Sequence, residues 1–157
     1  MFDINYDQDT PLQPAFPLET GEVVAATEWA IAHAATYNAN PANVVMIGGE
    51  AAGGLVKSKN YVISIGQALG CAGDFSACSP SYERELSPAL NVPASGCPDW
   101  LLLASQVDET AVAQADEMLV ELQAAACGAS LGIVPTGHGF SVWSQVSHRI
   151  FEFVRAE

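Results

Sequence analysis

The stretch Val44-Val-Met-Ile-Gly-Gly-Glu-Ala-Ala-Gly-Gly54 decides how the rest of the chain is interpreted. It opens with an uninterrupted apolar run, Val44 to Ile47, which is typical of a parallel strand buried on both faces. Glycines at 48, 49, 53 and 54 follow, and the residues up to Lys59 favour a short helix. The stretch therefore predicts a strand, a glycine-rich turn and a helix, which is the repeating unit of α/β proteins.

Two nucleotide-binding loops are excluded for this turn. A dinucleotide-binding loop needs glycine at alternate positions, and Glu50 breaks that pattern after Gly48. A P-loop needs a lysine and a serine or threonine after its last glycine, whereas Gly54 is followed by leucine and valine. The turn therefore does not match either phosphate-binding pattern.

The same turn fits the backbone of a nucleophile elbow. An elbow has the pattern G-x-S-x-G, because small flanking residues let the backbone turn tightly while one side chain stands exposed. Gly49 and Gly53 occupy the two glycine positions, and Ala51 occupies the serine position between them. The sequence thus predicts the elbow's shape without its reactive hydroxyl. Ser58 and Glu50 are poorly placed to replace that hydroxyl.

Strand and helix patterns alternate along the remaining chain. This alternation predicts an α/β fold with a mostly parallel sheet and helices on both faces. Residues 70–98 are rich in glycine, serine and proline, and we expect a long irregular crossover there. Gly128 is expected to stop the helix before it, and the three tryptophans are expected in the core. The expected strands are 2–6, 44–47, 61–65, 100–103 and 131–134, and the expected helices are 21–37, a short one ending near 59, 110–126 and 140–154.

Composition limits the class of protein. The chain has 157 residues, half of them hydrophobic, which fits one domain over 1–157. Its formal net charge of −13 repels phosphates, so nucleic acid and anionic lipid are disfavoured as partners. We expect no membrane-spanning segment, and the absence of a signal-like N-terminus favours a cytoplasmic location.

The four cysteines favour free thiols over a metal site. Cys71, Cys78, Cys97 and Cys127 form no C-x-x-C pair, and no histidine lies at ligand spacing from them, so no metal is expected. The first three share one irregular stretch, which leaves a disulfide staple open as an alternative. Without a secretion signal we expect the thiols to be reduced.

Three expected strands each end close to a residue of interest. Position 51 follows the strand 44–47, Asp108 follows 100–103, and His138 follows 131–134. Catalytic groups gather at the carboxyl ends of parallel strands, so these loops are expected to converge. Two simpler interpretations stay open: Asp108 as the N-cap of the following helix, and His138 as a loop residue without a role. His33 and His148 are expected to be surface or hydrogen-bonded core residues.

The chain resembles the hormone-sensitive-lipase and BD-FAE-like branches of the α/β-hydrolase family. The likeness runs through nearly the whole chain, and its most specific parts are the glycine-rich elbow and the His-Gly-Phe segment. The matching segments are Asn5–Tyr6, the prolines up to Pro17, the helix around Trp29, Asn40–Gly54, Ser87–Pro88, Pro98–Asp108 and Val134–Phe140.

This resemblance implies a Ser-His-Asp mechanism acting on a small-molecule ester or acyl ligand, with no cofactor. His138 is then the general base and acid, Asp108 orients its ring, and the Ala52 N–H supplies half of the oxyanion hole. The family places a His-Gly-Gly-Gly oxyanion loop and further strands ahead of the matching region. We therefore expect a partial α/β-hydrolase domain lacking its N-terminal strands, with an exposed sheet edge where a homodimer can form.

Because Ala51 replaces the nucleophile, the leading expectation is a carboxylic-ester hydrolase lineage whose chain is inactive or nearly so. The alternative, from a different class, is a non-catalytic binding or interaction module that keeps the acyl pocket. A weaker third option is a hydrolase completed by a separate N-terminal fragment.

Overall fold

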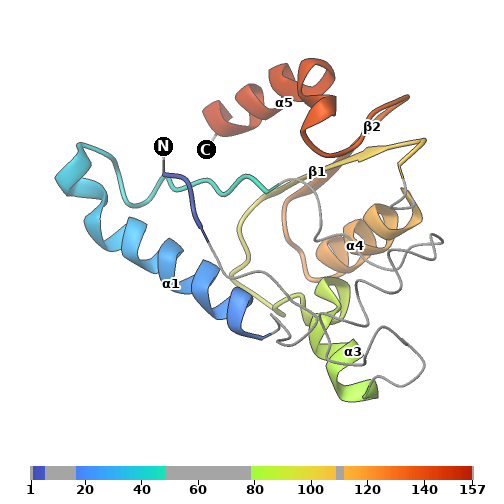
Figure 1. The fold of residues 1–157 in the computed structure, drawn as a ribbon, viewed down its shortest axis with the longest axis horizontal. Coiled ribbons are helices and arrows are strands. Elements are labelled where there is room, and N and C mark those ends of the chain that lie inside the picture. The colour runs from blue at the N-terminus through green and yellow to red at the C-terminus, as the bar shows by residue number, and fades with distance from the viewer. Residues whose placement is uncertain (1, 6–16, 49–78, 109–111, 157) are drawn as a thin grey trace. The chain divides into compact units, whose positions relative to one another are not determined.

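The computed structural model describes residues 2–5, 17–48, 79–108 and 112–156 (Figure 1). These residues divide into two compact units. Residues 2–5 and 17–47 belong to the first, and residues 48, 79–108 and 112–156 belong to the second. None of the helices in these ranges has the length and apolar character needed to cross a bilayer.

The first unit is built on one long helix. Helix α1 spans Leu18–His33 and continues as a 3₁₀ turn, η1, over Ala34–Tyr37, which agrees with the helix expected over 21–37. The helix ends because Asn38 adopts a left-handed conformation (φ 57°), which asparagine tolerates better than most residues.

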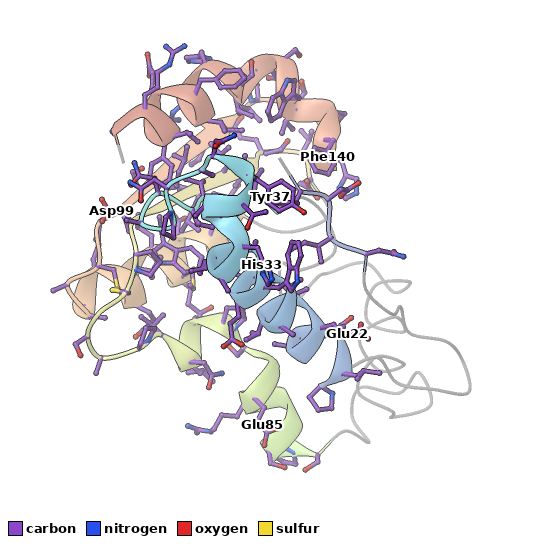
Figure 2. All side chains as sticks on the ribbon, turned by 90° about the vertical axis from the view of Figure 1, so that its left-hand side faces the viewer. Glu22, His33, Tyr37, Glu85, Asp99 and Phe140 are labelled. Atoms are coloured by element: carbon purple, nitrogen blue, oxygen red, sulfur yellow. A yellow bond between two sulfur atoms is a disulfide. The ribbon has the colours of Figure 1, made fainter. Side chains whose placement is uncertain are left out.

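An exposed aromatic cluster lies on this unit. The ring of Phe2 packs edge-on against those of Trp29 and Tyr37, and Trp29 stacks on His33 at a centroid distance of 4.3 Å. Figure 2 shows His33 and Tyr37 projecting from the same helical segment. Trp29 is 46% exposed, so its expected place in a core is wrong. His33 donates from Nδ1 to the Trp29 carbonyl oxygen at 2.7 Å, as a surface histidine can.

The expected strand at 44–47 is not formed. This segment has no regular secondary structure, and Met46 and Ile47 are more than half exposed. Residues 2–5 likewise form no strand. An apolar run specifies a strand only when a neighbouring strand completes its hydrogen bonds, and none of the described residues does so here. The expected strand at 61–65 and the helix ending near 59 lie outside the described residues.

The second unit opens with two short helical turns inside the segment expected to be irregular. Helix α3 spans Pro80–Leu86, and the 3₁₀ turn η3 spans Pro88–Asn91. Proline suits the first helical position because its missing N–H would have no partner there. The Asn91 side-chain amide donates to the carbonyls of Arg84 and Ser87, which satisfies the end of the helix. The irregular crossover expected over 70–98 is therefore wrong for these residues.

A parallel strand pair forms the centre of the second unit. Strand β1 (Trp100–Ser105) pairs with β2 (Ala129–Val134) in register from Trp100–Ala129 to Ser105–Val134. Helix α4 (Val112–Ala124) connects the strands and lies on one side of them, and α5 (Trp143–Ala156) lies on the other (Figure 1). The expected mixed α/β architecture is confirmed at this level. In the described part of the chain the sheet has two strands, and the homodimer expected at a sheet edge stays a prediction.

The core lies on both faces of this strand pair. Val134, Val146 and Ile150 are buried between β2 and α5, and Leu122 of α4 is fully buried. Burial of such side chains contributes about 1.5–3 kcal/mol each. The remaining tryptophans do not join them, because Trp100 is 37% exposed and Trp143 is 40% exposed. Trp143 packs instead against Phe151 on the same helix, so the expectation of core tryptophans is wrong here too.

Helix α4 ends differently from the expectation. Ala126 takes the left-handed conformation (φ 59°), and the next N–H, of Cys127, donates to the Leu122 carbonyl. This pattern is a Schellman motif with alanine where glycine is preferred. Gly128 lies beneath Asp99 instead, and a side chain at this position would require the exposed Asp99 carboxylate to move.

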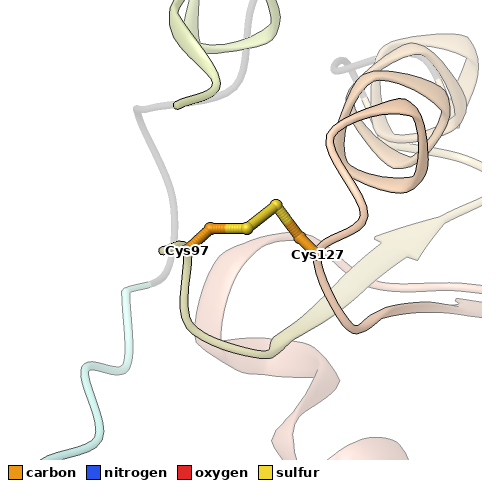
Figure 3. The surroundings of a disulfide bond; sticks show 2 residues. All are labelled: Cys97 and Cys127. Atoms are coloured by element: carbon orange, nitrogen blue, oxygen red, sulfur yellow. A yellow bond between two sulfur atoms is a disulfide. The ribbon is translucent and has the colours of Figure 1, made fainter. Parts of the chain in front are cut away.

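A disulfide bond joins the two strands at their amino ends. Cys97 lies before β1 and Cys127 lies before β2, and their Cα atoms are 5.7 Å apart (Figure 3). The Trp100 N–H donates to the Gly128 carbonyl at 2.7 Å, which extends the strand ladder toward the bond. The expectation of free thiols is wrong for this pair, because parallel pairing brings together the residues that precede the two strands. Cys71 and Cys78 lie outside the described residues.

Candidate catalytic site

The carboxyl ends of β1 and β2, at the far side of the strand pair from the disulfide, lead to Asp108 and His138. Asp108 is three residues beyond the end of β1, and His138 is four residues beyond the end of β2. The structure brings these side chains together: His138 Nδ1 lies 3.0 Å from Asp108 Oδ1. The carboxylate is the more buried partner, at 15% exposure against 55% for the imidazole. Convergence of three strand-end loops was expected; it is seen for the loops of Asp108 and His138, and position 51 of the third loop lies outside the described residues.

The strand ladder holds the loop that carries the acid. The N–H of Gln106 donates to the Val134 carbonyl at 2.9 Å, which continues the parallel pairing one residue past β1. The Asp108 N–H then donates to the Ser105 carbonyl at 3.4 Å and turns the chain. The carboxylate position therefore follows from the register of the two strands.

The loop that carries the imidazole depends on two glycines. Gly137 has φ +114° and Gly139 has φ +51°, while His138 between them is extended. A side chain at Gly137 would place its Cβ 2.6 Å from Val142 Cγ1 in addition to the unfavourable backbone angle. These requirements explain the Gly-His-Gly pattern: glycine adopts positive φ angles at the least cost, and Gly137 also has no room for a side chain.

Two further side chains hold this loop, Ser141 from the 3₁₀ turn η4 (Gly139–Val142) and Gln145 from α5, and sequence reasoning missed both. The Ser141 hydroxyl accepts from the His138 N–H at 2.8 Å and donates to the His138 carbonyl at 2.6 Å. Gln145 Nε2 donates to the Thr136 carbonyl at 2.7 Å. A serine three residues after the loop histidine, just before a helical period, is the spacing of a reciprocal cap and could have identified the first contact.

The geometry of the Asp108–His138 pair determines which ring nitrogen can act as a base. A carboxylate oxygen only accepts hydrogen bonds, so the neutral ring must carry its proton on Nδ1 to bond with Asp108. The basic lone pair is then on Nε2. The pair can therefore take up a proton at Nε2 and hold the resulting imidazolium beside a negative charge, which is general acid–base chemistry.

The remaining expected site residues are not described by the structure. Four of them lie outside the described residues: Gly49, Ala51, Ala52 and Gly53. Within the described ranges, no group of three or more His, Cys, Asp and Glu side chains is arranged to hold a metal ion. His148 is exposed on α5, as expected for a surface histidine.

Comparison of the chain with family models, with curated proteins and with solved structures finds no match. The resemblance to the α/β-hydrolase family therefore stays a proposal that depends on the chain's own residues and on the Asp108–His138 geometry.

Proposed function

We propose that the chain belongs to a carboxylic-ester hydrolase lineage of α/β-hydrolase fold, with alanine at the nucleophile position. The observation that carries this proposal is the 3.0 Å contact between His138 Nδ1 and Asp108 Oδ1. Each residue follows one of two neighbouring parallel strands, at the edge where catalytic groups of such sheets gather. The chain order of position 51, Asp108 and His138 also matches the nucleophile, acid and base order of that fold.

In this proposal each residue has a separate part. Asp108 holds the imidazole in the tautomer with its proton on Nδ1, and His138 Nε2 removes the nucleophile's proton and later protonates the leaving alcohol. The backbone N–H of Ala52 donates to the oxyanion of the tetrahedral intermediate. The substrate is a small ester, and the mechanism requires no metal or organic cofactor.

The methyl group of Ala51 makes the chain inactive or nearly so. A methyl group cannot attack a carbonyl carbon, and removing the serine from a serine hydrolase lowers kcat about a millionfold. An acyl-binding module without turnover is the second candidate function, because the Asp108–His138 pair is formed in a chain that has alanine at position 51.

The decisive experiment restores the hydroxyl. The Ala51→Ser variant is assayed with p-nitrophenyl acetate beside the original chain. Because a catalytic serine contributes about a millionfold to kcat in a serine hydrolase, we expect the turnover of Ala51→Ser to rise by several orders of magnitude.

The matched control carries the same new hydroxyl without the base. The Ala51→Ser/His138→Ala double variant should lose nearly all of the gained turnover, because the serine then has no proton acceptor. Equal rates in the single and double variants would exclude the proposed mechanism. Saturable binding of the ester without turnover in the Ala51→Ser variant would instead favour the binding module.

A further inference from the structure

The backbone of His138 is held at both of its polar groups by one side chain. Its N–H donates to the Ser141 hydroxyl at 2.8 Å, and its carbonyl accepts from that hydroxyl at 2.6 Å. The carbonyl also accepts from the Ser141 backbone N–H at 3.0 Å. Three hydrogen bonds therefore join these two residues, and two of them depend on the hydroxyl.

These bonds lie between two glycines. Gly137 and Gly139 flank His138, and glycine has a wider choice of backbone angles than any other residue. A backbone segment between two glycines has many orientations available to it, and each would carry the imidazole to a different place. The Ser141 bonds restrict rotation of the segment between the two glycines. They therefore restrict the direction of the His138 Cα–Cβ bond, which carries the ring.

The position of the ring matters because the contact with Asp108 tolerates little displacement. Hydrogen bonds weaken steeply with distance and angle beyond the 3.0 Å separation seen here. The imidazole is more than half exposed, so a restraint on the backbone that carries it contributes directly to where the ring lies.

We propose that Ser141 is a positioning residue for His138: its hydroxyl fixes the backbone of the Gly137–Gly139 segment and thereby keeps the imidazole bonded to Asp108. This role rests on the proposed function for its catalytic consequence. The positioning itself is present in the chain with Ala51 and can be measured there.

A purely structural role for Ser141 makes a different prediction. If the hydroxyl only caps η4 (Gly139–Val142), its loss would lower stability and leave the ring's tautomer unchanged. If it positions His138, its loss would let the ring rotate away from Asp108, and the tautomer with the proton on Nε2 would become populated.

The first test is long-range ¹H–¹⁵N NMR of the histidine rings in the Ala51 chain at a pH where the imidazoles are neutral. We expect His138 to be mainly protonated on Nδ1 in the original chain and in Ser141→Thr, which retains the hydroxyl. In Ser141→Ala we expect a mixture of both tautomers. Ser144→Ala is the matched control, because Ser144 is an exposed serine on the next turn whose hydroxyl makes no hydrogen bond with the other described residues.

The second test measures kinetics in the Ala51→Ser background. Misplacing a catalytic group by about 1 Å can cost about a hundredfold, so Ser141→Ala should lower kcat about ten- to a hundredfold with KM nearly unchanged. Ser141→Thr should restore most of kcat, and Ser144→Ala should not change it.

The outcomes separate this inference from the proposed function. A Ser141→Ala chain that keeps the tautomer of the original chain overturns the positioning role, whatever the activity. A changed tautomer in an Ala51→Ser protein that shows no ester turnover supports positioning and contradicts the hydrolase proposal. Loss of kcat that Ser141→Thr does not restore also overturns the role assigned to the hydroxyl.

Discussion

The two ends of the β1–β2 pair are held together in different ways. At the amino ends, the Cys97–Cys127 disulfide joins the strand entries covalently. At the carboxyl ends, a hydrogen bond between Asp108 and His138 joins the loops that follow the strands. The Ser141 hydroxyl holds the backbone of His138, which lies between two glycines. The first connection tolerates small motions without breaking, whereas the second is lost when a ring rotates. One end therefore contributes mainly to stability and the other depends on exact side-chain orientation.

The largest effect is expected at the carboxyl end, on activity. In the Ala51→Ser background, Asp108→Asn should lower kcat about ten-thousandfold, because an amide permits the wrong imidazole tautomer. The free energy of unfolding should change far less than this loss, which corresponds to about 5.5 kcal/mol of transition-state stabilisation. Ester kinetics and urea denaturation of the same samples measure both quantities.

Asp99→Asn provides the matched control at the amino end, since this carboxylate lies over Gly128 and is remote in the strand register from the strand exits. Its kcat should equal that of the parent. A comparable loss of kcat in both variants would mean that the net negative charge of the chain, rather than the Asp108–His138 contact, controls the rate.

The next effect is expected at the amino end, on stability. The Cys97→Ser/Cys127→Ser double variant opens a loop of 30 residues. The chain-entropy relation gives a loss of about 3.5 kcal/mol in the free energy of unfolding. The kcat of the Ala51→Ser protein should stay within about twofold at temperatures where the variant is folded. A large fall in kcat there would show that the two ends are not independent.

The smallest effect compares one glycine at each end. Gly96 (φ +74°) lies beside the disulfide, and a side chain there would meet open space, so Gly96→Ala should cost about 1 kcal/mol for the backbone angle alone. Gly137 (φ +114°) lies beside His138, and its alanine variant would also press on Val142, so its cost should reach about 2–3 kcal/mol.

Denaturation of the two glycine variants measures this difference, and kcat of Gly137→Ala should fall as well because the turn before His138 shifts. Equal losses of stability at positions 96 and 137 would contradict the steric role assigned to Val142.

The elements predicted well from the sequence are those that pack within the second unit. The expected strands at 100–103 and 131–134 and the helices at 110–126 and 140–154 all form, with boundaries shifted by a few residues. The apolar side chains of each of these elements pack against elements that are near to it in the sequence. The apolar run at 44–47 has an equally clear pattern but no described strand beside it, and it does not form a strand. Hydrophobicity alone cannot supply the missing hydrogen-bond partner.

The Asp108–His138 contact could be predicted because a general rule places side chains at the carboxyl ends of parallel strands. No comparable rule identified the Cys97–Cys127 bond, since its geometry depends on which strands become neighbours. Sequence patterns also failed for Trp29 and Trp143, because an aromatic ring can pack against another exposed ring as well as within a core.

The disulfide also makes a closed ring of the chain that includes β1, the aspartate and α4. A protease that cuts once inside this ring, for example near the turn after β1, separates no fragment from the rest. The acid and the base then stay on one covalently joined molecule, and the strands stay paired at their entries. A nicked form of this protein would migrate as a single species until its disulfide was reduced.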